Sequence, residues 1–286
     1  MWPKPPLDPV NAQSRRALFP RGLAQPAQGF RFGADTLLLA AFAARSLPLA
    51  KPGGAKPFTG LDLGTGCGAA SFGLLLLRPD LELALTGIDT GPEMVAAAAD
   101  NARALGLADS FQAQVADVQD FRRPGFHLAL ANPPFRKPGT GRACPDAARH
   151  RARFEGPGGF AAFAACAARC LRPGGRLFLV HLAERLPELL RVLEDHGLAP
   201  RQALPVQGKS GQAPRLVLLE CLREGRRDAR RGGGRGGFAL LAPLALYAAD
   251  GSLTSEAAAF CPPLGVNPRQ AVAGEGLALA KGGNAE

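Results

Sequence analysis

Apolar and polar positions along the chain form two kinds of segment. Short apolar runs predict strands, and Ala- and Leu-rich stretches with apolar residues three or four positions apart predict helices. The expected strands are Thr59–Leu63, Leu83–Asp89, Phe111–Ala116, Phe126–Ala131, Arg176–Leu182, Leu198–Val206 and Arg215–Leu222. The expected helices are Ala69–Leu77, Glu93–Leu105, Gly159–Leu171 and Leu186–His196. This alternation is typical of a doubly wound, Rossmann-like α/β sheet that is mostly parallel, and the last two strands, joined only by a loop, predict an antiparallel edge strand.

Segments outside the alternation divide the chain into parts. Residues 1–28 are Pro-rich and basic, and we expect a loosely ordered N-terminal arm. Arg172-Pro173-Gly174-Gly175 predicts the end of a helix before the next strand. The low-complexity insert 223–237 is rich in Arg and Gly, and is interpreted either as an arm that grips RNA or as a disordered insertion. We therefore expect one domain over residues 29–262, with a disordered tail at 263–286.

A rigid, proline-rich turn after an apolar strand is the candidate reactive site. The run Phe126–Ala131 is followed directly by Asn132-Pro133-Pro134-Phe135. Proline has no N–H and restricts the residue before it, so the turn is stiff and its carbonyls lack a local donor. A base stacked on Phe135 would direct its exocyclic amino group at the Asn132 side-chain oxygen and the Pro133 carbonyl. This suits transfer of a group onto an amine nitrogen; the alternative is a rigid turn without chemistry.

A glycine loop after the first expected strand is the candidate cofactor site. Gly64, Gly66 and Gly68 allow a tight turn and close approach of a ligand to the backbone. The pattern Gly64-x-Gly66-x-x-Ala69 also fits a dinucleotide fingerprint, so the loop alone leaves a nicotinamide oxidoreductase open.

Two acids end the strands that follow the loop. Asp89 lies about 27 residues after Asp62, where a carboxylate can accept both hydroxyls of a ribose. Asp117 follows the third strand and could accept from the amino group of an adenine. Taken singly, Asp89 could be a solvated strand end and Asp117 a turn cap; their order along the chain favours a nucleoside site.

The charge of the chain suggests an anionic partner. The formal net charge is +10, which favours nucleic acid. Basic residues follow Phe135 at the mouth of the expected site, where phosphates would pass, although a solvated loop is the alternative. The candidates for contact with RNA are Arg136, Lys137, Arg149 and Arg151.

Length and composition exclude several classes of protein. The 286 residues, 47% of them apolar, are enough for one domain with tails. There is no run of about 18 apolar residues and no apolar N-terminal stretch, so we expect neither a membrane span nor a secretory signal. The six cysteines form no C-x-x-C pair, which indicates a reducing cytoplasm and no metal site. We expect a monomer.

In this order, the motifs resemble those of class I S-adenosylmethionine-dependent methyltransferases, in the branch that modifies amino nitrogens with an Asn/Asp-Pro-Pro-aromatic motif. The resemblance implies S-adenosylmethionine as cofactor and Asn132, Pro133, Pro134 and Phe135 as the catalytic motif. It places the methionine and ribose at the glycine loop, the ribose hydroxyls on Asp89 and the adenine near Asp117. The cofactor-binding residues implied are Asp62, Gly64, Thr65, Gly66, Gly68, Asp89, Asp117 and Val118.

A segment upstream of the glycine loop narrows the resemblance. Gly29–Ala40, with the sequence GFRFGADTLLLA, is similar to the N-terminal motif of the bacterial tRNA N6-adenine methyltransferases, which modify the adenosine beside the valine tRNA anticodon. In that family an aromatic-Arg-Phe stretch and an acid support the methionine end of the cofactor, which implies roles for Phe32, Asp35 and Thr36. The residues alone also fit an ordinary helix start with Asp35 as N-cap, and both interpretations can hold.

The function implied is S-adenosylmethionine-dependent N6-methylation of an adenine in RNA, in a tRNA near its anticodon. No metal and no general base are needed, and His127 is interpreted as a core histidine. The alternatives are N5-glutamine methylation of a release factor, whose enzymes share the motif, and N2-guanine methylation of ribosomal RNA. A non-catalytic RNA-binding protein on a degenerate fold is an alternative from another class, and cofactor binding would discriminate. The insert 223–237 and the tail depart from the family pattern.

Overall fold

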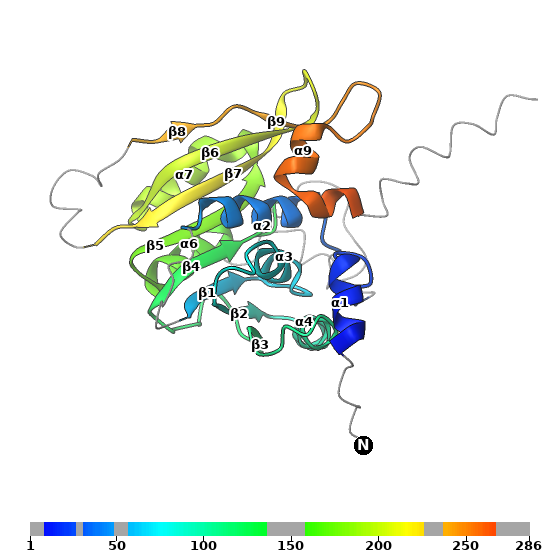
Figure 1. Cartoon of the computed structure of the whole chain (residues 1–286). Coiled ribbons are helices and arrows are strands. Elements are labelled where there is room, and N and C mark those ends of the chain that lie inside the picture. Colours follow the sequence, from blue (N-terminus) through cyan, green and yellow to red (C-terminus); the bar gives the residue numbers. More distant parts are fainter. Residues whose placement is uncertain (1–8, 27–30, 49–56, 136–157, 226–236, 267–286) are drawn as a thin grey trace, which may run out of the picture.

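The fold is built on a nine-stranded sheet with the order β3-β2-β1-β4-β5-β7-β6-β8, to which β9 adds by pairing with β6 (Figure 1). The computed structural model describes residues 9–26, 31–48, 57–135, 158–225 and 237–266. The strands are β1 Phe58–Leu63, β2 Leu83–Asp89, β3 Phe111–Val115, β4 Phe126–Ala131, β5 Leu171–Leu182, β6 Leu198–Lys209, β7 Pro214–Arg223, β8 Ala239–Leu240 and β9 Leu244–Tyr247. The helices are α1 Pro9–Ala17, α2 Ala34–Ser46, α3 Ala69–Leu77, α4 Pro92–Ala104, α6 Gly159–Cys170, α7 Leu186–Asp195 and α9 Ser255–Phe260, with 3-10 turns η1 Ala183–Arg185 and η2 Pro262–Val266.

The expected doubly wound, mostly parallel sheet is confirmed. Strands β1 to β5 pair in parallel, and β7 runs antiparallel to both β5 and β6. The antiparallel strand β7 therefore lies inside the sheet, between β5 and β6, and not at the expected edge. Beyond β7, strand β6 pairs on its other side with β8 and β9. The order reverses between β1 and β4, which is where open α/β sheets bind ligands, at the carboxyl ends of the strands.

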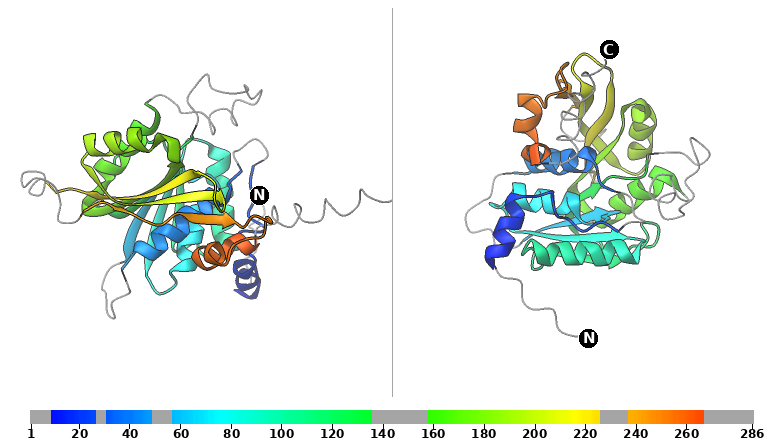
Figure 2. Two further views of the ribbon diagram at one scale, coloured as in Figure 1. Left: turned by 90° about the horizontal axis from the view of Figure 1, so that it is seen from above. Right: turned by 90° about the vertical axis from the view of Figure 1, so that its right-hand side faces the viewer.

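Helices cover both faces of the sheet. One core joins α2, α3 and α4 to a face of the sheet, together with the segment around α9, and includes Phe42, Leu74 and Ala98. The other core lies between the opposite face and the helices α6 and α7. Figure 2 (left) shows α6 and α7 on the side of the sheet opposite α2 and α9. Both faces being covered explains why the central parallel strands β1, β2 and β4 are mostly buried on both sides, whereas β3 at the sheet edge alternates between buried and more exposed residues.

The predicted stop signal at Arg172–Gly175 is wrong in its boundary. The helix ends at Cys170, and β5 begins at Leu171. Phe126 pairs with Leu171 and Leu128 pairs with Arg176, so the intervening residues bulge from the strand rather than precede it. Gly175 has no room for a side chain there, since an added Cβ would meet the carbonyl oxygens of Arg172 and Phe126 at 2.9 and 3.0 Å.

The N-terminal arm is more ordered than its composition indicates. Pro9–Ala17 forms helix α1. The guanidinium of Arg16 donates to the carbonyl oxygens of Leu105 and Gly106 at 2.6 Å each, at the end of α4. The loose arm expected for residues 1–28 is therefore wrong for this stretch, because long-range hydrogen bonds hold it.

Candidate functional site

The candidate site lies where the carboxyl ends of β1 and β4 meet. Leu63, at the end of β1, pairs with Ala131, at the end of β4. The glycine loop leaves β1 at this level and Asn132 leaves β4. The tertiary structure thus brings together the two motifs that lie about 70 residues apart in the sequence, as expected for the switch point of a doubly wound sheet.

The glycine loop is open at Gly66 and closely packed at Gly68. Gly66 has φ +55° and no atom within 4 Å of the position of an added Cβ, so its backbone faces open space. Gly68, at φ +88°, caps α3, and a Cβ there would lie 2.4 Å from the ring of Phe72. Any side chain at Gly68 would therefore be strained both by its backbone and by that ring.

Asp89 joins the glycine loop to the end of β2. Its Oδ2 accepts from the Gly66 N–H at 2.9 Å, and its Oδ1 accepts from the Gly91 N–H at 2.8 Å. Burial raises the pKa of Asp89, and the hydrogen bonds from these backbone groups oppose the rise. A carboxylate oxygen can accept more than one hydrogen bond, so both oxygens retain capacity for the hydroxyls of a ribose.

Asp62 lies beneath the loop and organises it. Its Oδ2 accepts from the hydroxyls of Thr65, at 2.8 Å, and Ser71, at 2.7 Å. The side chain is buried, and burial raises its pKa to about 6, with a contribution from the nearby charge of Asp89. The Thr65 hydroxyl, expected at the cofactor, is bonded to Asp62 in this structure.

The raised pKa of Asp62 predicts a pH-dependent stability. Its pKa in the unfolded chain is about 3.9, so the folded state binds this proton more tightly. The contribution to stability is fully present below that value and is lost as the pH rises through about 6. We expect Asp62→Asn to gain stability relative to the wild type by up to about 3 kcal/mol between pH 4 and pH 7. Urea denaturation at several pH values measures this, and a difference independent of pH would contradict it.

Asn132 is oriented by the first turn of helix α2. Its Nδ2 donates to the Asp35 Oδ2 at 3.1 Å and to the Thr36 Oγ1 at 2.9 Å. Because a carboxyl oxygen and a hydroxyl oxygen both accept from this nitrogen, the amide nitrogen faces the first turn of α2. Both hydrogens of the amide are thereby used, and the side-chain oxygen remains as the group that can accept from a ligand.

Asp35 is not the N-cap of this helix. Helix α2 begins at Ala34, and the cap is Gly33, without a side-chain bond. The interpretation of Asp35 as N-cap is wrong because its carboxylate instead reaches across to Asn132. Burial raises the pKa of Asp35, and the hydrogen bond from Asn132 opposes that rise.

Phe135 and Phe32 each have further neighbours of their own. Phe135 is half-buried, and its ring centroid lies 5.0 Å from that of His181. Phe32 packs against Cys67 and Ala69 of the glycine loop and against Ala97 of α4. The position of Phe32 is thus consistent with its expected place near the loop.

Asp117 and Val118 follow β3. The Oδ1 of Asp117 accepts from the Gln119 N–H at 2.7 Å, which forms a tight turn and leaves the other oxygen for a ligand. Val118 is half-buried, and its carbonyl accepts from Arg169.

The four residues expected to contact RNA lie outside the described residues. These four are Arg136, Lys137, Arg149 and Arg151. Most of the insert 223–237 and most of the tail also lie outside the described residues.

Asn101 of α4 is a residue that sequence reasoning missed. It is buried, and its Nδ2 donates to the carbonyls of Cys67 and Ala24 at 3.0 Å each. Its Oδ1 accepts from the Ala24 N–H at 2.7 Å. The sequence signal that could have identified Asn101 is a polar residue on the apolar face of a helix. Through these hydrogen bonds, Asn101 joins the N-terminal arm to the glycine loop.

Asn101→Ala is expected to destabilise the protein by about 1–3 kcal/mol, because it leaves backbone groups of Cys67 and Ala24 without their partner. Denaturant unfolding of the variant measures the loss. The control is Asn11→Ala, which removes an exposed amide that is bonded to Arg15. Equal stabilities of the two variants would contradict the assigned role.

The histidines supply no metal site within the described ranges. His127 accepts at Nδ1 from the Thr59 N–H, at 3.1 Å, and its ring lies against Phe58, which confirms a satisfied histidine. Across the described part of the chain, no three residues among His, Cys, Asp and Glu are grouped so as to hold a metal ion. Within the same residues, no helix has the length and apolar character to span a membrane.

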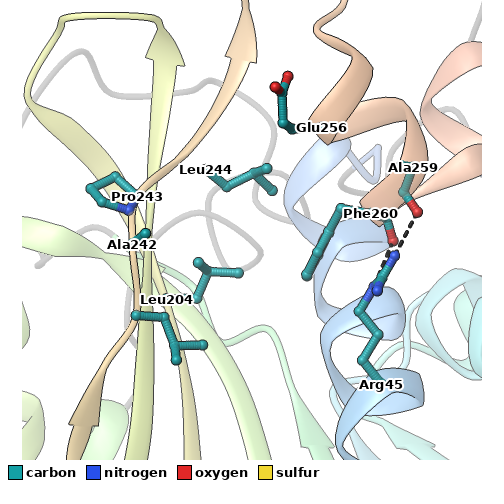
Figure 3. A pocket seen from close by; sticks show the side chains of 9 residues that line it. Arg45, Leu204, Ala242, Pro243, Leu244, Glu256, Ala259 and Phe260 are labelled. Atoms are coloured by element: carbon teal, nitrogen blue, oxygen red, sulfur yellow. Dashed lines mark hydrogen bonds between the residues drawn. The ribbon is translucent and has the colours of Figure 1, made fainter.

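A cavity elsewhere on the molecule is separate from this site. It has a volume of about 470 Å³ and lies between β6, β9 and α9, at the C-terminal end of α2 (Figure 3). The guanidinium of Arg45, which lines it, donates to the carbonyls of Ala259 and Phe260 and stacks on the Phe260 ring at 4.9 Å. The site residues of α2 lie at the opposite end of that helix, in its first turn.

The chain is similar to known methyltransferases. A family profile described as "Methyltransferase domain" matches residues 56–197. The chain is 31% identical over 159 residues to the tRNA1(Val) (adenine(37)-N6)-methyltransferase of Tolumonas auensis, covering 56% of this chain and 66% of the relative. It is 36% identical over 159 residues to the release factor glutamine methyltransferase of Cereibacter sphaeroides, covering 53% and 56%. The matches thus span less than two thirds of the length of these two relatives.

Among solved structures, the fold is similar to that of a predicted O-methyltransferase from Agrobacterium tumefaciens. The TM-score is 0.56 at 17% identity, covering 80% of this chain and 96% of the other. At this identity, the likeness establishes the fold.

Proposed function

A methyltransferase profile matches residues 56–197, and we propose that this chain is a class I S-adenosylmethionine-dependent methyltransferase. We propose that it methylates the N6 amino group of an adenine in RNA, and that this RNA is a tRNA modified near its anticodon. The observation that carries the proposal is the orientation of Asn132. Its amide nitrogen is held by Asp35 and Thr36, so its side-chain oxygen can accept from a substrate NH2 group. The relative from Tolumonas auensis supports adenine as the base.

The residues at β1 and β2 fit the cofactor. The backbone at Gly66 faces open space, and Asp89 offers two partly satisfied carboxylate oxygens beside it. We propose that Gly64, Gly66 and Gly68 lie along the methionine and ribose, that Asp89 accepts from the ribose hydroxyls, and that Asp117 and Val118 flank the adenine. When bound, S-adenosylmethionine supplies a methyl group on a positively charged sulfur.

The protein contributes orientation and electrostatics. An aromatic amine is a weak nucleophile, because its lone pair is delocalised into the ring. Hydrogen bonds from its protons to the Asn132 oxygen and the Pro133 carbonyl would favour a pyramidal nitrogen with its lone pair directed out of the base plane. We propose that Phe135 stacks on the base, which an unpaired loop nucleotide can present at low cost. Arg136, Lys137, Arg149 and Arg151 are proposed to contact its phosphates.

We also propose that the catalytic unit extends over residues 29–262, with residues 1–28 as a basic arm. The C-terminal part of this unit packs on its N-terminal helix, since the Cys261 Sγ lies 3.4 Å from the Leu37 carbonyl oxygen. The helix α9 lies beside α2 in both views (Figures 1 and 2). Residues far apart in the sequence thus support the helix that orients Asn132.

A second candidate is N5-methylation of a glutamine in a release factor. A glutamine amide presents a planar NH2 group that the Asn132 oxygen would accept equally well. The 36% identity to such an enzyme is the observation that favours it.

Methyl transfer from labelled S-adenosylmethionine decides between these substrates. Total tRNA, ribosomal RNA and release factors are offered separately, and the products are analysed as nucleosides or peptides. We expect N6-methyladenosine in tRNA. Label in a release factor, or N2-methylguanosine in ribosomal RNA, would overturn the assigned substrate and keep the chemistry.

A further inference from the structure

His181 lies at the end of β5, beside the Asn-Pro-Pro-Phe turn. Leu179 of β5 pairs with Ala131, the last residue of β4, so His181 is two residues beyond this level on the neighbouring strand. The side chain is fully buried, at 0% exposure. Strand β5 thus places a buried imidazole beside the turn that follows β4.

The imidazole is anchored on one nitrogen only. Its Nδ1 accepts from the Leu182 N–H at 2.8 Å, so the neutral ring carries its hydrogen on Nε2. That Nε2 is buried and has no hydrogen-bond partner among the described residues. Burial, with the charge of Arg185, lowers the pKa of His181 to about 4, which keeps the ring neutral.

The imidazole of His181 packs against two aromatic rings. Its centroid lies 5.0 Å from the Phe135 ring, inclined at 52°, and 5.9 Å from the Phe160 ring, at 74°. The imidazole therefore packs between Phe160 of helix α6 and the ring of Phe135.

The same β5–α7 connection also reaches the backbone of Phe135. Arg185 donates from Nη1 to the Phe135 carbonyl oxygen at 3.5 Å, and its guanidinium pairs with Glu188. The ring and the carbonyl of Phe135 are thus both contacted from one short segment. That segment is built on β5 and α7, which belong to the rigid core.

We propose that His181 is a positioning residue, whose ring sets the orientation of the Phe135 ring against which the substrate base is placed. This rests on the proposed function, in which Phe135 stacks on the base. Offset or inclined packing of aromatic rings fixes their relative angle better than aliphatic packing does. A base placed on a Phe135 ring of the wrong inclination would present its amino group away from the Asn132 oxygen.

Three variants at position 181 distinguish the role of the aromatic ring from that of the hydrogen bond between Nδ1 and the Leu182 N–H. His181→Phe keeps an aromatic ring and removes both nitrogens. His181→Asn keeps an acceptor for the Leu182 N–H and removes the ring, and His181→Ala removes both. The matched control is His196→Ala just after α7, because His196 bonds to the Val192 carbonyl and lies outside the site.

We expect His181→Ala and His181→Asn to lower kcat by up to about 100-fold, the loss typical of a misplaced reacting group, with the Kd for S-adenosylmethionine unchanged. His181→Phe should retain activity close to that of the wild type. If His181→Ala keeps full kcat, or if His181→Phe loses as much as His181→Ala, the proposal is wrong.

A second measurement does not depend on the substrate. With 4-fluorophenylalanine at position 135, the 19F spectrum reports the surroundings and order of that ring. We expect a shifted or broadened signal in His181→Ala and His181→Asn and a wild-type line in His196→Ala; an unchanged line in all variants would overturn the positioning role. If the wild type methylates no RNA while the 19F signal responds as expected, the proposed function fails and the ring contact stands.

Discussion

Replacing Asn132 with alanine is expected to lower the kcat of methyl transfer by about 1000-fold, which abolishes useful turnover, while cofactor binding survives. The variant removes the side-chain oxygen that we propose accepts from the substrate while Asp35 and Thr36 bind the amide nitrogen. Loss of one preorganised hydrogen-bonding group at a reacting centre typically costs about 100- to 1000-fold in kcat. We expect a loss at the upper end, because the amino nitrogen would keep its planar, unreactive geometry.

The measurement is kcat with labelled S-adenosylmethionine and tRNA, together with the Kd of S-adenosylmethionine by calorimetry. Gln212→Ala is the matched control, since it removes an exposed amide in the turn between β6 and β7. A parallel loss of cofactor binding would contradict the prediction. It would show that Asn132 acts on the shape of the site through α2 rather than on the substrate.

Asp89→Ala is expected to raise the Kd for S-adenosylmethionine by about 100-fold or more. It removes two charged acceptors proposed for the ribose, each hydrogen bond to a charged group contributing about 1.5–3 kcal/mol. It also releases the N–H groups of Gly66 and Gly91 from their partner, so the glycine loop loses its tie to β2.

Calorimetric titration with S-adenosylmethionine tests this directly. Asp195→Ala provides the comparison, because Asp195 is an exposed acid at the end of α7 that pairs with Arg191. Far-UV circular dichroism confirms that both variants are folded. An unchanged Kd for S-adenosylmethionine in Asp89→Ala would show that the ribose hydroxyls do not bind this carboxylate. Asp89 would then serve only to order the glycine loop.

Local patterns were sufficient for most of the sheet and its helices. The expected strands Leu83–Asp89 and Phe126–Ala131 and the helix Ala69–Leu77 match the structure residue by residue. These segments are mostly apolar runs, and their length and the turn-forming residues beside them, more than their periodicity, distinguish strand from helix. Predictions were wrong where a distant strand or helix supplied the deciding contact.

Arg172–Gly175 and Pro9–Ala17 illustrate that limit. Arg172–Gly175 has the composition of a turn, but pairing with β4 draws it into β5 as a bulge. Pro9–Ala17 has the composition of a loosely ordered arm, but Arg16 reaches the carbonyls at the end of α4. No window of neighbouring residues contains these partners.

For the candidate site too, some features follow from the sequence and others depend on the tertiary structure. The sequence by itself determined the chemical groups and their order: a glycine loop, an acid at the end of β2, and an amide before two prolines and a phenylalanine. These are short motifs whose backbone geometry is local. Only the tertiary structure decided what holds them, namely Asp35 on Asn132, Asn101 on the glycine loop, and His181 against Phe135. Hydrogen-bond direction and ring packing depend on atoms that are brought together by strand order and helix placement, and linear spacing carries no record of them.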